Sequence, residues 1–168
     1  MPNWCQNNLK IEGKKEDLED FISKSKDGKF TLEAYYPYET EDGEWDYDWC
    51  AENWGTKWDV NTEIGMVLVL DSSPISPGEI DKTTELLEIN GEITLKFDTA
   101  WGPCCEGIAK IAENYPNLTF KHTYFEAGHW FGGNYTYEDG KVTECIDIPP
   151  EHLTEDLVRD LGFDSYYY

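Results

Sequence analysis

Residues 93–124, ITLKFDTAWGPCCEGIAKIAENYPNLTFKHTY, carry the most regular pattern in the chain. Apolar and polar residues alternate over 93–98, which is typical of a strand with one buried face. Pro103 suits the first turn of a helix, and apolar residues then recur at helical spacing until Pro116. Alternation returns over 118–124. This stretch therefore predicts a strand, a helix and a second strand.

The N-terminal half contains a similar order of elements. Alternation over 4–11 predicts a strand, and apolar residues at helical spacing predict a helix over about 14–25. A further strand is expected over 58–71 and a short helix over 80–89. Strand, helix, strand, strand, helix, strand is the split β-α-β order. The sequence thus predicts an α+β fold, a ferredoxin-like sandwich with an antiparallel sheet and both helices on one face.

The C-terminal part predicts an addition to this core. Strands over 131–137 and 142–148 flank a Glu-Asp-Gly turn, which is a hairpin signal. A last helix follows Pro149-Pro150, with its apolar side formed by Leu153, Leu157 and Leu161.

These patterns predict one domain over 1–168. It has a core at 1–126, an aromatic and acidic insertion at 30–58, and a hairpin-plus-helix extension at 127–168. We expect the insertion and the hairpin to cover the helix-free face of the sheet, because an open apolar face is unfavourable. We expect either the hairpin or the insertion to shield the apolar edge strand at 66–70.

Composition limits the class of partner. Thirteen Lys and Arg residues against 35 Asp and Glu residues give a formal net charge of −22. Such a chain lacks the electrostatic attraction that drives direct binding to nucleic acid or to an anionic membrane. The aromatic share of 15% favours a folded protein over a disordered acidic one.

The sequence also bears on compartment and cofactors. The N-terminus has no basic segment followed by an apolar run, so we predict a cytoplasmic protein. The five cysteines include no C-x-x-C pair, which argues against a zinc ribbon. We expect neither a cofactor nor a metal.

Four phrases of the chain resemble a known family. They are MPNWCQNNLKI at 1–11, ENWGTKWD at 52–59, FDTAWGP at 97–103 and YFEAGHWFGG at 124–133. Together they resemble the YubB-type ferredoxin-like proteins of phages and plasmids, over about residues 1–140. The resemblance implies a ferredoxin-like fold and a mobile-element setting, without a specific activity. Cys104 departs from it, because a second proline often stands at that place.

The first candidate site is a run of carboxylates in the insertion. On an ordered loop they would replace the phosphates of DNA and attract a basic host protein, either a nucleic-acid-handling or a defence factor. This hypothesis requires the acidic residues of the chain to gather in one patch. Two alternatives are a solvated loop and a calcium site, although EF-hand spacing is absent. The predicted partner-binding residues are Glu39, Glu41, Asp42, Glu44, Asp46 and Asp48.

The second candidate is an aromatic and polar set taken from the family-like phrases. Tryptophans beside Lys, Glu and His would form a pocket in which a flat, nucleotide-like ligand stacks. The alternative is that the tryptophans only fill the helix-free face of the sheet. The predicted ligand-binding residues are Trp54, Lys57, Trp58, Trp101, Glu126 and His129.

A third hypothesis is an enzyme. Cys104 or Cys105 at a helix start would have a lowered pKa, with His129 or His122 as base and Glu126 orienting His129. No catalytic motif accompanies these residues, and His122 lies on the apolar side of its strand, as a core residue would. We assign no catalytic residue. The leading prediction is a non-enzymatic, strongly acidic phage- or plasmid-type binding protein that inhibits its basic partner.

Overall fold

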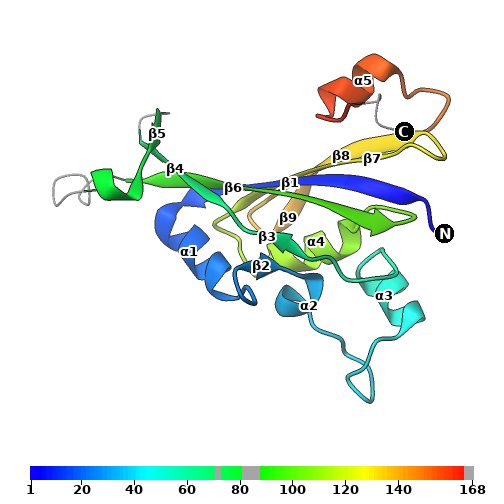
Figure 1. The fold of residues 1–168 in the computed structure, drawn as a ribbon, viewed down its shortest axis with the longest axis horizontal. Coiled ribbons are helices and arrows are strands. Elements are labelled where there is room, and N and C mark those ends of the chain that lie inside the picture. Colours follow the sequence, from blue (N-terminus) through cyan, green and yellow to red (C-terminus); the bar gives the residue numbers. More distant parts are fainter. Residues whose placement is uncertain (71–72, 81–87, 165–168) are drawn as a thin grey trace.

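The computed structural model describes residues 1–70, 73–80 and 88–164. Its main element is a seven-stranded antiparallel sheet in the order β5-β4-β6-β1-β7-β8-β9 (Figure 1). The neighbouring strands β4, β6, β1 and β7, with two helices on one face, form the ferredoxin-like arrangement, which confirms the predicted fold class. The strands are β1 (Trp4–Lys14), β4 (Met66–Leu70), β5 (Ser73–Ile75), β6 (Asn90–Ala100), β7 (Thr119–Glu126), β8 (Phe131–Glu138) and β9 (Lys141–Ile148).

The helices α1 (Lys15–Ser23) and α4 (Cys105–Glu113) lie on the same face of the sheet (Figure 1). Their apolar side chains are buried against strands that alternate as the sequence predicted: Leu9 of β1 and Leu95 of β6 are both inaccessible to solvent. Burial of these alternating side chains supplies the main hydrophobic stabilisation of the fold.

The insertion packs on this same helical side (Figure 1). It contains α2 (Leu32–Tyr35) and α3 (Tyr47–Asn53), and a two-stranded ladder of β2 (Lys29–Phe30) and β3 (Thr62–Glu63) joins its flanks. The prediction that it covers the opposite face was wrong. Its large apolar side chains extend the core between sheet and helices, so they gain more burial there.

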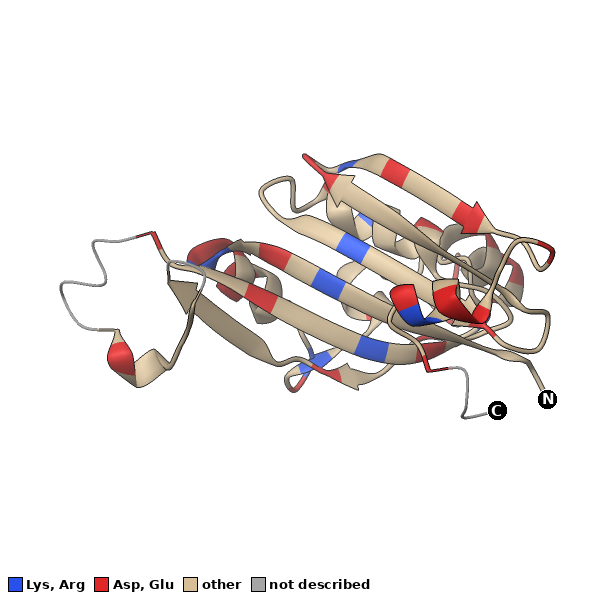
Figure 2. Cartoon of the chain, turned by 90° about the horizontal axis from the view of Figure 1, so that it is seen from above, with Lys and Arg blue, Asp and Glu red and all other residues tan. Residues whose placement is uncertain are grey.

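The opposite face of the sheet is polar in its central part and does not need a full cover. Lys10 lies 3.1 Å from Glu92 on β6, and Lys121 of β7 lies 2.7 Å from Glu12. Figure 2 shows basic and acidic positions on neighbouring strands of this face. The outward positions of these strands carry charged pairs that water can solvate. The expected need for a cover assumed an apolar face, and this part of the sheet is not apolar.

The C-terminal segment covers only one end of that face. The hairpin of β8 and β9 continues the sheet sideways, and α5 (Glu155–Asp160) lies above the sheet (Figure 1). Leu157 is exposed, whereas Val158 is buried, so the predicted apolar side of this helix was partly wrong. The second hydrophobic cluster consists of Phe125, Leu153, Val158 and Phe163.

The apolar strand β4 is shielded by the segment that follows it. It pairs with β6 on one side and with the short β5 on the other, so neither the hairpin nor the insertion covers its edge, contrary to the prediction. The helix expected over 80–89 falls largely on 81–87, outside the described residues. Within the described part of the chain, no helix has both the length and the apolar character needed to span a membrane.

Candidate functional site

Exposed aromatic side chains surround Lys57 at the end of the sheet where β1 begins. The Lys57 ammonium lies 4.4 Å from the ring centroid of Trp58, 5.2 Å from that of Trp101 and 5.9 Å from that of Tyr47. Trp4 continues the group, with its ring 6.1 Å from that of Trp58. We call these residues, together with Trp45, the aromatic edge. The five rings are between 37 and 47% exposed, although side chains of this size are usually buried.

The start of α3 fixes one side of the aromatic edge. Asp46 caps the helix, because its Oδ1 accepts a hydrogen bond of 2.8 Å from the Trp49 amide. Just before the cap, the Trp45 indole N–H donates to the Lys57 carbonyl at 3.0 Å. This bond joins the loop that carries the predicted partner-binding carboxylates, residues 39–48 and called the acidic loop below, to the segment that carries Lys57.

Trp101 is held in an unusual backbone conformation. Its φ is 69°, in the left-handed region that non-glycine residues rarely adopt. Its amide donates to the Asn3 carbonyl at 2.8 Å, which ties it to the start of the chain. A bulky residue in this region costs about 1 kcal/mol or more. An exposed tryptophan held at that cost is consistent with a role in recognition.

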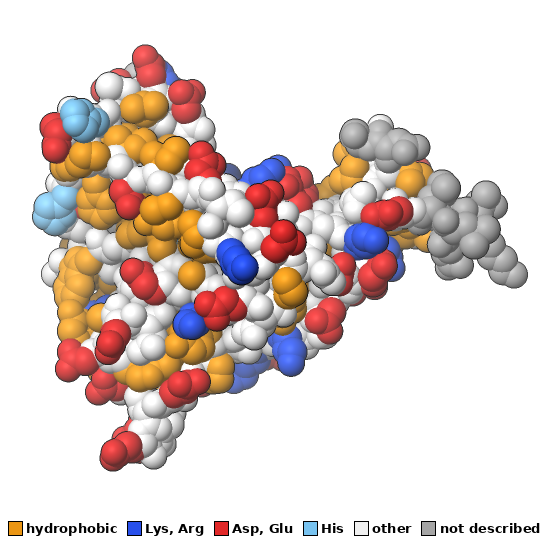
Figure 3. Space-filling view, turned by 180° about the vertical axis from the view of Figure 1, so that it is seen from behind, with side chains coloured by type: hydrophobic (Ala, Val, Ile, Leu, Met, Phe, Trp, Pro, Cys, Tyr) orange, Lys and Arg blue, Asp and Glu red, His pale blue; other side chains and the backbone are white. Residues whose placement is uncertain are grey.

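The acidic loop lies beside the aromatic edge. All six predicted partner-binding carboxylates are exposed. The Asp42 carboxylate accepts from the Glu44 amide at 3.1 Å and therefore orders the turn. However, the loop holds only six of the 35 acidic residues. Figure 2 shows acidic positions on strands and helices throughout the fold, and Figure 3 shows acidic side chains spread over the face that it views. The expectation that the acidic surplus gathers in one patch was wrong.

The predicted ligand-binding set is divided by the structure. Lys57, Trp58 and Trp101 come together on the aromatic edge, whereas Trp54 is fully buried. The Trp54 indole N–H donates to the Tyr36 carbonyl at 3.0 Å, and its ring packs 5.6 Å from Trp49. Trp54 is therefore a packing residue that a ligand does not reach, and its predicted binding role was wrong.

Glu126 and His129 form a pair near this end of the molecule. Glu126 is 1% exposed, and its carboxylate accepts from the amides of Gly128 and His129. The Nδ1 atom of His129 lies 3.0 Å from the same carboxylate and 3.0 Å from the Asn3 amide nitrogen. Glu126 thus orients His129 as expected. Since Asn3 also bonds Trp101, His129 lies at the border of the aromatic edge.

The cysteine hypothesis is met in its geometry but not in its chemistry: the Cys105 Sγ atom lies 3.8 Å from the Nδ1 atom of His122, but the predicted lowering of the thiol pKa is absent. Cys104 is wholly buried, and burial raises the pKa of the Cys104 and Cys105 thiols instead of lowering it. His122 is also buried, and desolvation lowers its pKa to about 4. Its Nε2 bonds the Asn7 Oδ1 atom at 2.8 Å, which confirms that His122 is a satisfied core residue. These thiols are held in the unreactive neutral form.

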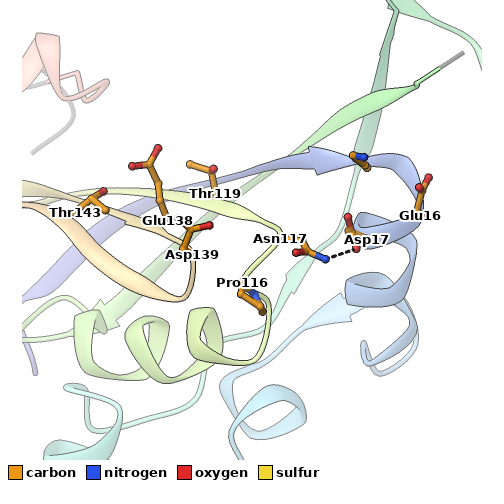
Figure 4. Close-up of a pocket in the computed structure, with 9 residues that line it drawn as sticks. Glu16, Asp17, Pro116, Asn117, Thr119, Glu138, Asp139 and Thr143 are labelled. Atoms are coloured by element: carbon orange, nitrogen blue, oxygen red, sulfur yellow. Dashed lines mark hydrogen bonds between the residues drawn. The ribbon is translucent and has the colours of Figure 1, made fainter.

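An acidic cavity of about 700 Å³ lies at the far end of the molecule (Figure 4). Figure 4 shows Glu16 and Asp17 on one side of it, Glu138 and Asp139 on the other, and Asn117 between them. Asn117 donates to Asp17 at 3.3 Å. Among the described residues, neither this cavity nor the acidic loop gathers three His, Cys, Asp or Glu side chains in a metal-binding arrangement.

The sequence interpretation missed three members of the aromatic edge: Trp4, Trp45 and Tyr47. A signal for two of them was present, because acidic and aromatic residues alternate from 44 to 48, EWDYD. Trp4 lies on the outward side of the first strand pattern, where a large apolar residue is unusual. These exposed positions become a site only when the fold joins them to Lys57.

Comparison with known proteins agrees with the architecture. Residues 79–161 match the family described as a ferredoxin-like domain in Api92-like protein, a range that contains β6, α4, β7, β8, β9 and α5. No curated protein and no solved structure matches the chain. The match supports the ferredoxin-like part of the resemblance, whereas the YubB-type relationship and the mobile-element setting stay predictions. Over residues 79–161 the chain is therefore similar to the ferredoxin-like domain of Api92-like proteins, and its fold is ferredoxin-like.

Proposed function

We propose that the protein is a non-enzymatic binding protein whose aromatic edge and acidic loop recognise a Lys- and Arg-rich surface of a partner protein. The observation that carries the proposal is the position of the Lys57 ammonium over three exposed rings. The faces of these rings are arranged to receive cations, and the rings stay open to solvent on their other sides.

The chemistry of the aromatic edge suits a protein interface. Trp and Tyr are enriched at interface hot spots because they bury a large area at a small loss of conformational entropy. A cation over an exposed ring contributes about 0.5–1 kcal/mol, and more once a partner removes water. Lys57 already makes this interaction, and the part of each ring that stays exposed is where a cation of the partner would bind.

The carboxylates supply steering and a preference for a basic partner. A formal charge of −22 attracts a positively charged protein from a distance, and the acidic loop lies next to the rings that it would meet. In the narrower form of the proposal, the partner is a nucleic-acid-handling or defence protein of a host cytoplasm, inhibited by the six carboxylates of the acidic loop in place of phosphates, and not by the dispersed acidic surface. The phage or plasmid setting belongs to this narrower form.

The test uses an Arg- and Lys-rich peptide and the full-length protein. We expect the dissociation constant to rise steeply between about 0.05 and 0.5 M salt, since screening weakens exposed charge pairs. Trp58→Ala and Trp101→Ala should each weaken binding roughly tenfold. Leu157→Ala, an exposed apolar residue on α5, is the matched control and should bind normally. Equal affinity of all three variants would overturn the proposal.

A charge-reversal pair separates the acidic loop from the overall charge. Glu41→Lys with Asp48→Lys should weaken peptide binding at low salt more than the same two reversals at Glu151 and Glu155, which lie in the C-terminal segment. Equal losses would assign steering to the whole surface and remove the acidic loop from the interface. Stabilisation by a nucleotide that Trp58→Ala abolishes would favour the small-ligand alternative instead.

A further inference from the structure

A cavity of about 790 Å³ lies beside the aromatic edge. Gly55 and Gly102 line it, and these glycines belong to the two short segments that lead to Lys57 and Trp101. Its other walls come from the start of α4, from β7, β8 and β9, and from Pro149-Pro150. Its size is within the range of pockets that hold a small molecule or a long side chain. Figure 3, which views the molecule from behind, shows hydrophobic side chains gathered on the half of the molecule away from the grey residues.

The lining of this cavity combines aromatic rings with carboxylates. The Tyr124 and Tyr135 hydroxyls both donate to Asp147, the latter at 3.0 Å to Oδ2. Phe131 packs edge-on against Tyr124, at 6.3 Å between centroids. Glu106 also contributes to the lining, and none of the described residues that line the cavity is Lys or Arg. The lining is therefore anionic and aromatic, which favours a cationic occupant.

The carboxylate of Asp147 can accept a further hydrogen bond. A carboxylate has about four acceptor positions, and the two tyrosine hydroxyls use Oδ1 twice and Oδ2 once. Asp147 is itself exposed, so a group entering the cavity can reach it. The hydroxyl bonds fix its orientation before binding, which reduces the entropy lost when a partner binds.

Bare backbone forms the wall next to the aromatic edge. A Cβ atom on Gly102 would meet only the Gly55 carbonyl, at 3.8 Å, which is an ordinary contact. Gly132 differs, because a Cβ there would lie 2.8 Å from the Tyr124 carbonyl. Gly132 is thus required by strand packing, whereas the space at Gly102 belongs to the cavity and can be filled by a side chain.

We propose that this cavity binds an arginine side chain of the basic partner, an inference that rests on the proposed function. A guanidinium is planar, stacks on aromatic rings and donates to carboxylates, and its aliphatic stem fits the apolar rim. Lysine offers a compact, strongly hydrated charge and fits an aromatic wall less well. Anions are disfavoured, because Asp147 and Glu106 oppose the attraction of the α4 N-terminus.

The direct test titrates N-acetyl-arginine methylamide into the full-length protein and follows backbone amide chemical shifts. We expect shifts at Gly102, Glu106 and Gly132, and a several-fold weaker response to the lysine analogue. Asp147→Asn should lower the affinity roughly tenfold while leaving an acceptor for both tyrosines. Glu144→Gln, the same charge change on the same strand outside the cavity, should have no effect. Equal responses to the lysine analogue or to acetate would overturn the assignment.

A second variant fills the cavity. Gly102→Leu should abolish the arginine-induced shifts, and unchanged shifts would place the probe elsewhere and overturn the proposal. The peptide assay then separates this inference from the proposed function. If Trp58→Ala weakens the peptide but Asp147→Asn and Gly102→Leu do not, the function stands and the arginine site fails. If the probe fills the cavity but Trp58→Ala binds the peptide normally, the proposed function fails and the arginine site stands.

Discussion

Trp54 and Trp58 are four residues apart in one loop, yet they belong to two different regions of the molecule. Trp54 is fully buried and packs against Tyr38 and Trp49, whereas Trp58 is 37% exposed beside Lys57. The first contributes to packing, and the second presents a face to solvent. Residue type and local sequence do not distinguish them. The comparison shows that burial must be known before a tryptophan is assigned to folding or to recognition.

Polar groups differ between the same two regions. In the interior, every buried side-chain nitrogen and oxygen of the described residues has a hydrogen-bond partner. The Asn7 amide donates to Thr99 at 2.8 Å, and its oxygen bonds His122. At the aromatic edge, the Lys57 ammonium contacts ring faces beside solvated carboxylates. In the interior, hydrogen bonds to other side chains and to the backbone hold these buried polar groups in place. At the aromatic edge, exposed rings and carboxylates remain accessible to a partner.

The largest expected effect tests the packing side of this comparison. Trp54→Ala removes a fully buried ring and leaves a cavity, so the free energy of unfolding should fall by about 3–5 kcal/mol. Trp58→Ala should change it by no more than about 0.5 kcal/mol, because the ring is exposed. Urea titration of both variants measures the difference. Similar losses in the two variants would contradict the division between interior and edge.

The second-largest expected effect is the dependence of the free energy of unfolding on pH that buried His122 causes. Burial lowers the pKa of His122 from 6.5 to about 4, so between these values the unfolded chain binds a proton that the folded chain does not. Its contribution to stability is complete above about pH 6.5 and is lost as the pH falls toward 4. The resulting loss in the free energy of unfolding is about 3 kcal/mol.

His122→Gln, which keeps a neutral hydrogen-bond donor, provides the control. The difference in unfolding free energy between wild type and variant should shrink by up to about 3 kcal/mol between pH 7 and pH 4. Asp59 has a pKa raised by burial and acts in the opposite direction in both proteins, so it cancels in this difference. A difference that is constant with pH would show that His122 is not held neutral.

The smallest expected effect is on the helix cap at Asp46, which lies where the buried interior meets the aromatic edge. Asp46→Ala removes the cap of α3, and the free energy of unfolding should fall by about 1 kcal/mol. The variant should also bind the basic peptide more weakly, because the capped turn positions Trp45 and Tyr47. Asp48→Ala, which removes the same charge without a cap, is the control. If both variants lose the same stability, the cap does not fix the aromatic edge.

The order of elements was predictable because short-range patterns carry it. The alternation over 4–11 and 93–98 placed β1 and β6, and the hairpin signal before Lys141 placed β8 and β9. The side on which the insertion packs was not predictable. Its aromatic residues suit either face of a sheet, and only the competition for buried area assigned them to the helical side.

The candidate site was predicted in part. Lys57, Trp58 and Trp101 were selected from the sequence and do lie together, because the loop after α3 and the loop after β6 meet at the same end of the sheet. Trp54 was misassigned, since neighbours distant in sequence bury it. The cavity beside Asp147 was not found, because its walls join the segment around Ala51 and Gly55 to α4, β7, β8 and β9, which lie about 50 residues or more further along the chain.

The amino-acid sequence alone determined the fold class, the acidity and the abundance of aromatic residues, since each depends on composition or on patterns of a few residues. The tertiary structure decided which aromatic rings are exposed, which carboxylates lie beside them, and that burial raises the pKa of the Cys104 and Cys105 thiols. These properties depend on burial and on distances between segments remote in sequence, and a one-dimensional pattern does not contain either quantity.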